Sequence, residues 1–274
     1  MNISEYKYFL GGLLFFAISM VIFFSLALAG WPCPPEICVI HENPFCEELQ
    51  IGNIKQPIST FSNLSLVISG LVILIFLGKT RDDKENALDN PMAGPTFFSI
   101  LYAFITIFIG VGSMMYHASL TSYGGFLDEY AMVLYMAFLI IYTIIRLAKQ
   151  TEKGFITIYV PTILILAYIM IAGLVSGVLI FTVMVAVAFF LELFLQIAIR
   201  RLKSFKWIYR DWKWLAMGFG TFLLGFIVWL FTNAGDPLCF PYSWFQGHAI
   251  WHIAVGLATY FLFIYARTEK VKSI

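Results

Sequence analysis

Five polar residues occur at the ends of long apolar segments: Ser113, His117, Asp128, His248 and His252. Ser113 and His117 are four residues apart, as are His248 and His252, so on a helix each pair shares one face, one turn apart. Ionisable side chains within an apolar segment are functional candidates, because something must offset the cost of removing them from water. Three histidines with one open coordination position are typical of a catalytic zinc. The spacing therefore predicts a zinc site formed by His117, His248 and His252.

Asp128 and Ser113 are the predicted catalytic residues at this zinc. A carboxylate beside a metal can act as the general base for a metal-activated water, or it can orient a histidine ligand. A hydroxyl one turn from His117 can donate a hydrogen bond to a developing oxyanion. A single buried histidine is more often a core residue, and a structural zinc more often has four protein ligands, frequently including cysteine. The gathering of these residue types at one membrane depth favours a catalytic centre.

Membrane helices are the elements that must position these residues. The chain has 274 residues, of which 61% are hydrophobic and 12% charged, whereas soluble domains carry roughly a quarter charged residues. Apolar segments of about 20 residues recur, each long enough to cross a ~30 Å hydrocarbon core as a helix. We expect an all-α polytopic membrane protein, with no indication of nucleic-acid binding. The predicted spans are residues 8–30, 57–78, 96–118, 127–147, 155–174, 178–199, 214–233 and 248–266.

Three details of these spans follow from local sequence. Residues 8–30 resemble a signal peptide, but their apolar run is longer than such a peptide needs, so we expect a retained anchor helix. A glycine-containing turn, Tyr123-Gly124-Gly125, is expected to precede the fourth span, which Asp128 opens. Glu192, within the sixth span, is expected to make interhelical hydrogen bonds and to have no catalytic part.

The basic residues predict the topology. Of the seventeen Lys and Arg residues, all except Lys55 fall at the two termini or in alternate connections. By the positive-inside rule, both termini are cytoplasmic and the number of spans is even. The four cysteines (Cys33, Cys38, Cys46 and Cys239) then lie in extracytoplasmic loops, where an oxidising compartment would allow two disulfides in three connectivities. The same topology places the predicted zinc site near the extracytoplasmic face.

Three motifs resemble the alkaline ceramidase family: SMMYHASLT followed by LDEYAM, GHAIWHIAVGLATY, and QPISTFSNLSLVISG. The family belongs to a superfamily of membrane hydrolases that includes the adiponectin/progestin receptors and the Per1-like proteins. The resemblance covers about residues 44–267, a seven-helix core. It implies a catalytic domain at residues 44–274, preceded by an anchor helix and a cysteine-containing loop at residues 1–43. By motif match, the resemblance implies the same three zinc ligands, with Asp128 activating the water and Ser113 stabilising the transition state.

The resemblance carries two further expectations. It implies a Cys46–Cys239 disulfide, which leaves Cys33 and Cys38 as a second pair. Animal members also hold calcium with a stretch like Asp-Trp-Cys-Glu-x-Asn and a later Glu. Here the stretch reads PFCEEL, with Glu47 as a remaining carboxylate, and Gln56 stands at the later position. Calcium needs several oxygen ligands, so this departure argues against a calcium site.

The expected function is zinc-dependent intramembrane hydrolysis of a ceramide-like lipid amide, as part of sphingolipid metabolism in the plasma membrane or an endomembrane. A lipid substrate suits such a site, because it can approach laterally from the bilayer. One alternative is a lipid acyl-ester hydrolase of the Per1-like type. Another is a receptor-like protein that contains zinc and has little turnover. Because these classes share the motifs, the motifs leave both alternatives open. A zinc transporter is disfavoured, since its polar residues would extend through the whole bilayer depth.

Overall fold

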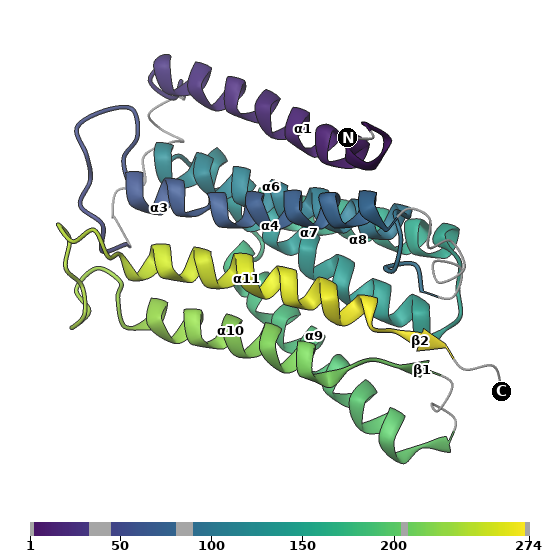
Figure 1. Ribbon diagram of the computed structural model, residues 1–274. Helices are drawn as coiled ribbons and strands as arrows, with labels where there is room; N and C mark the ends of the chain where they lie inside the picture. Colours follow the sequence, from purple (N-terminus) through teal and green to yellow (C-terminus); the bar gives the residue numbers. More distant parts are fainter. Residues whose placement is uncertain (1–2, 33–44, 81–89, 204–207, 272–274) are drawn as a thin grey trace.

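Long helices with similar axes make up the computed structural model of the protein, which describes residues 3–32, 45–80, 90–203 and 208–271 (Figure 1). Within these ranges eight helical segments are long and apolar enough to cross a membrane, as predicted. They are α1 (Ile3–Leu28), α3 (Pro57–Ser62) continued by α4 (Leu64–Lys79), α6 (Phe97–Ser119), α7 (Ser122–Leu147), α8 (Glu152–Ile171), α9 (Gly177–Arg201), α10 (Trp212–Leu230) and α11 (Gly247–Arg267).

The predicted glycine turn before the fourth span is wrong. The chain reverses at Leu120, whose left-handed backbone (φ 50°) closes α6, and Thr121 then caps α7 by accepting a hydrogen bond from Gly124 N. Gly124 therefore lies in the first turn of the helix, because the threonine cap outweighs the local glycine preference for a turn. A side chain there would meet Ser119 Oγ at 2.8 Å. The glycine thus serves close packing between α6 and α7.

The helices differ in how deeply they lie in the bundle. In α6, 72% of the apolar window is buried inside the protein, against 11% in α8. Helices α4, α7 and α11 contact α6, while α8 and α9 pack on α7 and α10 packs on α11. Helix α1 lies along α4 and α6, in a position that Figure 1 shows at one side of the bundle. The site residues are carried by the central helices, which neighbouring helices hold in place.

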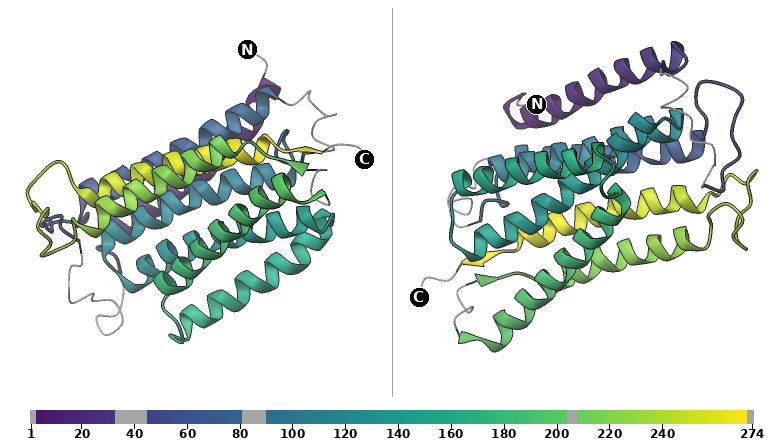
Figure 2. Two further views of the ribbon diagram at one scale, coloured as in Figure 1. Left: turned by 90° about the horizontal axis from the view of Figure 1, so that it is seen from below. Right: turned by 180° about the vertical axis from the view of Figure 1, so that it is seen from behind.

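Different elements form the two ends of the bundle. The end of α6 and the starts of α3, α7 and α11 lie at one end, which we call the disulfide end (Figures 1 and 2). The described chain begins and finishes at the other, terminal end, as an even number of spans requires. A short antiparallel pair closes that end: β1 (Ile208–Tyr209) lies beside β2 (Lys270–Val271), with Ile208 opposite Val271.

A buried ion cluster also lies at the terminal end. Arg210 donates to Glu192 Oε1 at 3.0 Å and to Glu269 Oε2 at 2.9 Å, and Arg146 also pairs with Glu269. Glu192 accepts a further hydrogen bond from the Tyr265 hydroxyl at 2.7 Å. The prediction that Glu192 makes interhelical hydrogen bonds is therefore confirmed. This cluster joins α7, α9, α11 and the segment before α10.

Candidate metal centre

The three histidines predicted to bind zinc lie together at the disulfide end. His117 is in the last turn of α6, and His248 and His252 are one turn apart at the start of α11. One potential ligand atom from each lies within 4.8 Å of the other two, and the Nε2 atoms of His117 and His248 are 3.0 Å apart. Metal–nitrogen bonds of about 2.0–2.1 Å to one tetrahedral zinc bring ligand nitrogens similarly close. All three side chains are buried.

Two polar side chains of the α3 segment orient two of the rings. Gln56 Oε1 lies 2.7 Å from His117 Nδ1, and Ser62 Oγ lies 2.8 Å from His252 Nδ1. Ser62 donates its own hydrogen to Ser59 O at 2.9 Å, so its oxygen must accept from the His252 ring. An amide oxygen can likewise only accept. Both rings therefore carry hydrogen on Nδ1, which leaves an Nε2 lone pair available for a metal.

This donor set fits zinc. Three neutral imidazole nitrogens are common zinc ligands, whereas calcium and magnesium take oxygen ligands. The third ring, His248, presents Nε2 to His117, and its buried Nδ1 has no hydrogen-bond partner among the described residues. In the described part of the chain, this is the one group of histidine, cysteine or acidic side chains close enough to hold a metal ion.

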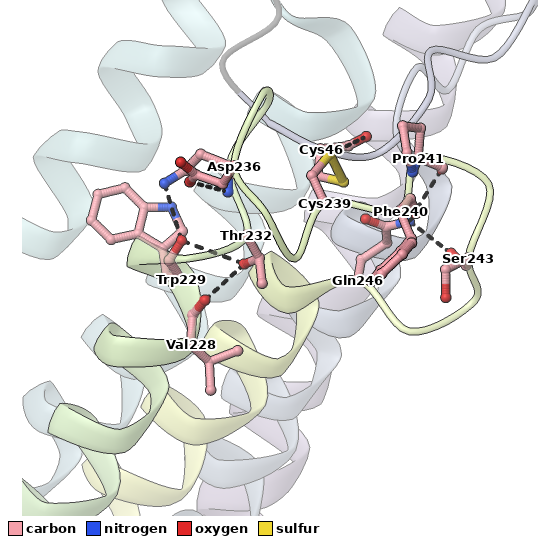
Figure 3. The surroundings of a disulfide bond; sticks show 11 residues. Cys46, Val228, Trp229, Thr232, Asp236, Cys239, Phe240, Pro241, Ser243 and Gln246 are labelled. Atoms are coloured by element: carbon pink, nitrogen blue, oxygen red, sulfur yellow. Dashed lines mark hydrogen bonds between the residues drawn. A yellow bond between two sulfur atoms is a disulfide. The ribbon is translucent and has the colours of Figure 1, made fainter.

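An aromatic ring packs against the histidines, and a disulfide follows it in the chain. The Phe45 ring packs on His117 and His248, with centroid distances of 4.7 and 4.3 Å. The next residue, Cys46, forms the predicted disulfide with Cys239, in the loop before α11 (Figure 3). The other expected pair, Cys33 and Cys38, lies outside the described residues. The loop that carries Phe45 is therefore covalently fixed to the loop leading into the two-histidine helix.

Ser113 and Asp128 meet where α6 and α7 cross closely. At Gly112 the helices are so near that an added Cβ would lie 2.8 Å from Leu127 O. The close crossing brings the Ser113 hydroxyl next to the Asp128 carboxyl group. Ser113 lies one helical turn from His117, and Asp128 is not part of the ligand group of three histidines. The predicted pair thus lies beside that group.

The residues that the resemblance connected with calcium make other contacts. The Glu47 carboxylate accepts from Ile58 N at 2.7 Å and from Ser59 N at 2.8 Å, so it caps the start of α3. A carboxylate is favourable there, because the first amide groups of a helix are unpaired donors. Gln56 supports His117 instead.

Sequence reasoning missed the roles of Gln56 and Ser62 as partners of the histidines. A signal was present, since Ser62, Ser65 and Ser69 recur at helical spacing within an apolar span. Ser65 donates to His252 O at 3.0 Å, and Ser69 bonds Thr259 at 3.1 Å, so this serine stripe faces α11. Small hydroxyl residues at such spacing are typical of helix contacts in membranes.

The fold and the site define a polytopic helical membrane protein with a buried three-histidine group suited to a metal ion. Residues 42–273 match the profile of the family described as Ceramidase, and the chain belongs to that family. All of α1 lies before the matched region. A search of curated proteins returns no match. The family assignment supports a membrane-embedded hydrolase that acts on ceramide, a lipid substrate.

Proposed function

We propose that the protein is a zinc-dependent hydrolase that cleaves the amide bond of a ceramide-like lipid, releasing a sphingoid base and a fatty acid. The observation that carries this proposal is the buried group of His117, His248 and His252, found in a chain of the Ceramidase family. These three residues would hold the zinc. When bound there, zinc supplies Lewis acidity to the amide carbonyl and lowers the pKa of a water.

Asp128 and Ser113 have the chemistry for the proton transfers. The Asp128 carboxylate takes one proton from the attacking water and later gives it to the nitrogen of the leaving sphingoid base. Before the reaction, the Ser113 hydroxyl lies next to Asp128 and can donate to its carboxylate. Once protonated, that carboxyl can itself donate to Ser113, so the serine hydrogen becomes available for the carbonyl oxygen as negative charge develops.

A lipid substrate is supported by an apolar cavity on the Asp128 side of the centre. It holds about 40 Å³ between α6, α7, α9, α10 and α11, and hydrophobic side chains form almost all of its lining. Met132, one turn after Asp128, contributes to the lining, as do Phe181 and Phe222. The cavity is far smaller than a small-molecule site of roughly 300–1,000 Å³, so its support for a lipid substrate lies in its apolar lining, one turn from Asp128.

The test measures hydrolysis of N-acyl sphingoid lipids and zinc content on the same purified samples. Asp128→Asn should keep zinc and lose about 10²–10⁴-fold in rate, because a general base is removed. Ser113→Ala should also keep zinc and lose about 10²–10³-fold. His248→Ala should lose both zinc and activity. Glu152→Gln changes an exposed carboxylate at the start of α8 and should change neither.

Two results would contradict the proposal in different ways. Wild-type turnover that Asp128→Asn and Ser113→Ala leave unchanged would remove the assigned roles. A wild-type protein that retains zinc but hydrolyses neither amide nor ester lipids would point to the receptor-like alternative. Hydrolysis confined to acyl esters would favour the Per1-like activity.

A further inference from the structure

A larger space lies on the outside of the bundle, between α3 and the start of α11. This groove has a volume of about 790 Å³, within the usual range for small-molecule sites, roughly 300–1,000 Å³. Phe61 and Ser62 line it from α3, and Ala249, Ile250 and Ile253 line it from α11. None of its lining residues belongs to α7, α9 or α10, which surround the internal cavity. The groove is therefore separate from that cavity.

One wall of the groove is a loop rich in exposed aromatic residues, residues 240–245, which we call the aromatic loop. Tyr242, Trp244 and Phe245 are 84%, 85% and 86% exposed, and all three line the groove. Aromatic side chains gather at the level of lipid head groups, where one part of the ring is apolar and another can remain hydrated. The position of the loop at the end of two spans matches that level.

Hydrogen bonds from one side chain and the disulfide fix the backbone of the aromatic loop. The buried Gln246 side chain places Nε2 at 3.1 Å from Phe240 O, 3.2 Å from Pro241 O and 2.7 Å from Ser243 O (Figure 3). The loop is also anchored through Cys239 of the disulfide. Because these contacts order the backbone before any ligand arrives, a ligand would bind at a lower entropic cost.

The lining indicates the kind of molecule that would fit. Ile250 and Ile253 are 42% and 48% exposed, and both line the groove. Polar groups gather at the loop end, among them Gln50 and Ser243. The lining contains no lysine or arginine among the described residues, and its carboxylate, Glu47, already accepts two backbone hydrogen bonds. An amphiphile with an uncharged head group is favoured, because a phosphate would lack a counter-charge.

The groove also borders the metal centre. Ser62 lines the groove and accepts the hydrogen bond from His252 Nδ1. We propose that the groove binds an uncharged long-chain lipid, with its chain along Ile250 and Ile253 and its head group under the aromatic loop. The lipid is thus held beside the metal centre, outside the bundle. Only the choice of an N-acylated lipid as the probe rests on the proposed function.

Photolabelling of the full-length protein in lipid nanodiscs tests this site. The probe is a ceramide that carries a diazirine in its acyl chain, and labelled peptides are mapped by mass spectrometry. We expect labels on the groove faces of α3 and α11. Ile253→Trp fills the groove and should reduce this labelling about tenfold, a loss of roughly 1.4 kcal/mol in affinity. Leu257→Trp is the matched control, since Leu257 is 49% exposed on the same helix but lies outside the groove.

The outcomes separate this proposal from the proposed function. Equal labelling of Ile253→Trp and Leu257→Trp would contradict lipid binding in the groove. Labelling of the groove by a diazirine phosphatidylglycerol as strong as that by the ceramide probe would also contradict the proposal. Zinc content and thermal unfolding, measured on the same variants, show whether each is folded. Groove labelling without hydrolysis by the wild type would leave the lipid site standing and remove the amidase proposal. Hydrolysis by the wild type without groove labelling would remove the lipid site and leave the amidase proposal standing.

Discussion

At the residue scale, the two side chains that contact the histidine rings decide which ring nitrogen is available to a metal. Gln56 and Ser62 each accept from an Nδ1–H group, so the Nε2 atoms of His117 and His252 are left for the ligand position. Residues in this position fix both the tautomer and the orientation of a ligand ring. The metal centre therefore includes residues from α3 and the segment before it as well as the three histidines.

Replacing Gln56 tests this support. Gln56→Leu keeps the size of the side chain but removes the acceptor, so we expect zinc affinity to fall about 10–100-fold. Gln56→Glu restores an acceptor oxygen and should recover most of the affinity. Competition with a chelator measures the affinity directly. If Gln56→Leu bound zinc as tightly as the wild type, the assigned hydrogen bond would have no role in the metal centre.

At the element scale, the disulfide connects two loops that each reach the metal centre. Phe45 precedes Cys46 and packs on two histidine rings, while Cys239 lies a few residues before the start of α11. The bridge closes a chain segment with a sequence separation of 193 residues. Such a long closure restrains the unfolded chain strongly. The disulfide thus supports both the stability of the bundle and the placement of the two-histidine helix.

The paired substitution Cys46→Ser with Cys239→Ser removes this bridge. We expect a loss of about 2–5 kcal/mol in the free energy of unfolding, and weaker zinc binding, because the start of α11 is no longer restrained. Thermal unfolding and zinc titration in detergent measure the two effects. Tyr242→Ser alters an exposed residue of the same region and should leave the unfolding temperature unchanged. Unchanged stability of the paired variant would rule out a stabilising role for the bridge.

At the scale of the whole molecule, the metal centre lies at one end of the bundle and the ion cluster of Arg210 at the other. Arg210 is buried, and its positive charge faces Glu192 and Glu269. Arg210→Met leaves both carboxylates without this partner, so we expect a loss of about 3–5 kcal/mol in stability. Lys213→Met, three residues further on and exposed, is the control and should change little. Equal unfolding temperatures for the two variants would contradict this assignment.

The two ends also define the orientation that the basic residues predict. The described chain begins and finishes at the terminal end, and the histidines lie at the disulfide end. In the sequence, sixteen of the seventeen basic residues, all except Lys55, fall at the two termini or in alternate connections. We therefore predict that both termini face the cytoplasm. Reporter fusions at each terminus measure this, and a reporter active on the opposite side of the membrane would refute it.

The sequence by itself determined the class of protein and predicted the three histidines that the structure brings together. Apolar runs of about 20 residues predict membrane helices, because no other single segment satisfies its backbone hydrogen bonds in lipid. A spacing of four residues predicts that Ser113 and His117 share one helix face, as do His248 and His252, because residues four apart lie one turn apart on a helix. The family motifs led to the Cys46–Cys239 pair, which the structure contains. The helix boundary before Asp128 was misplaced, since glycine there serves packing.

Tertiary structure alone decided the contacts between helices. Gln56 meets His117 across 61 residues, and Ser62 meets His252 across 190. The Ser113–Asp128 contact depends on how closely α6 and α7 cross at Gly112. Arg210 contacts Glu192 and Glu269 only because three separate parts of the chain pack together. Helical periodicity specifies which residues share a face, but the partner of that face is chosen by the packing of the whole bundle.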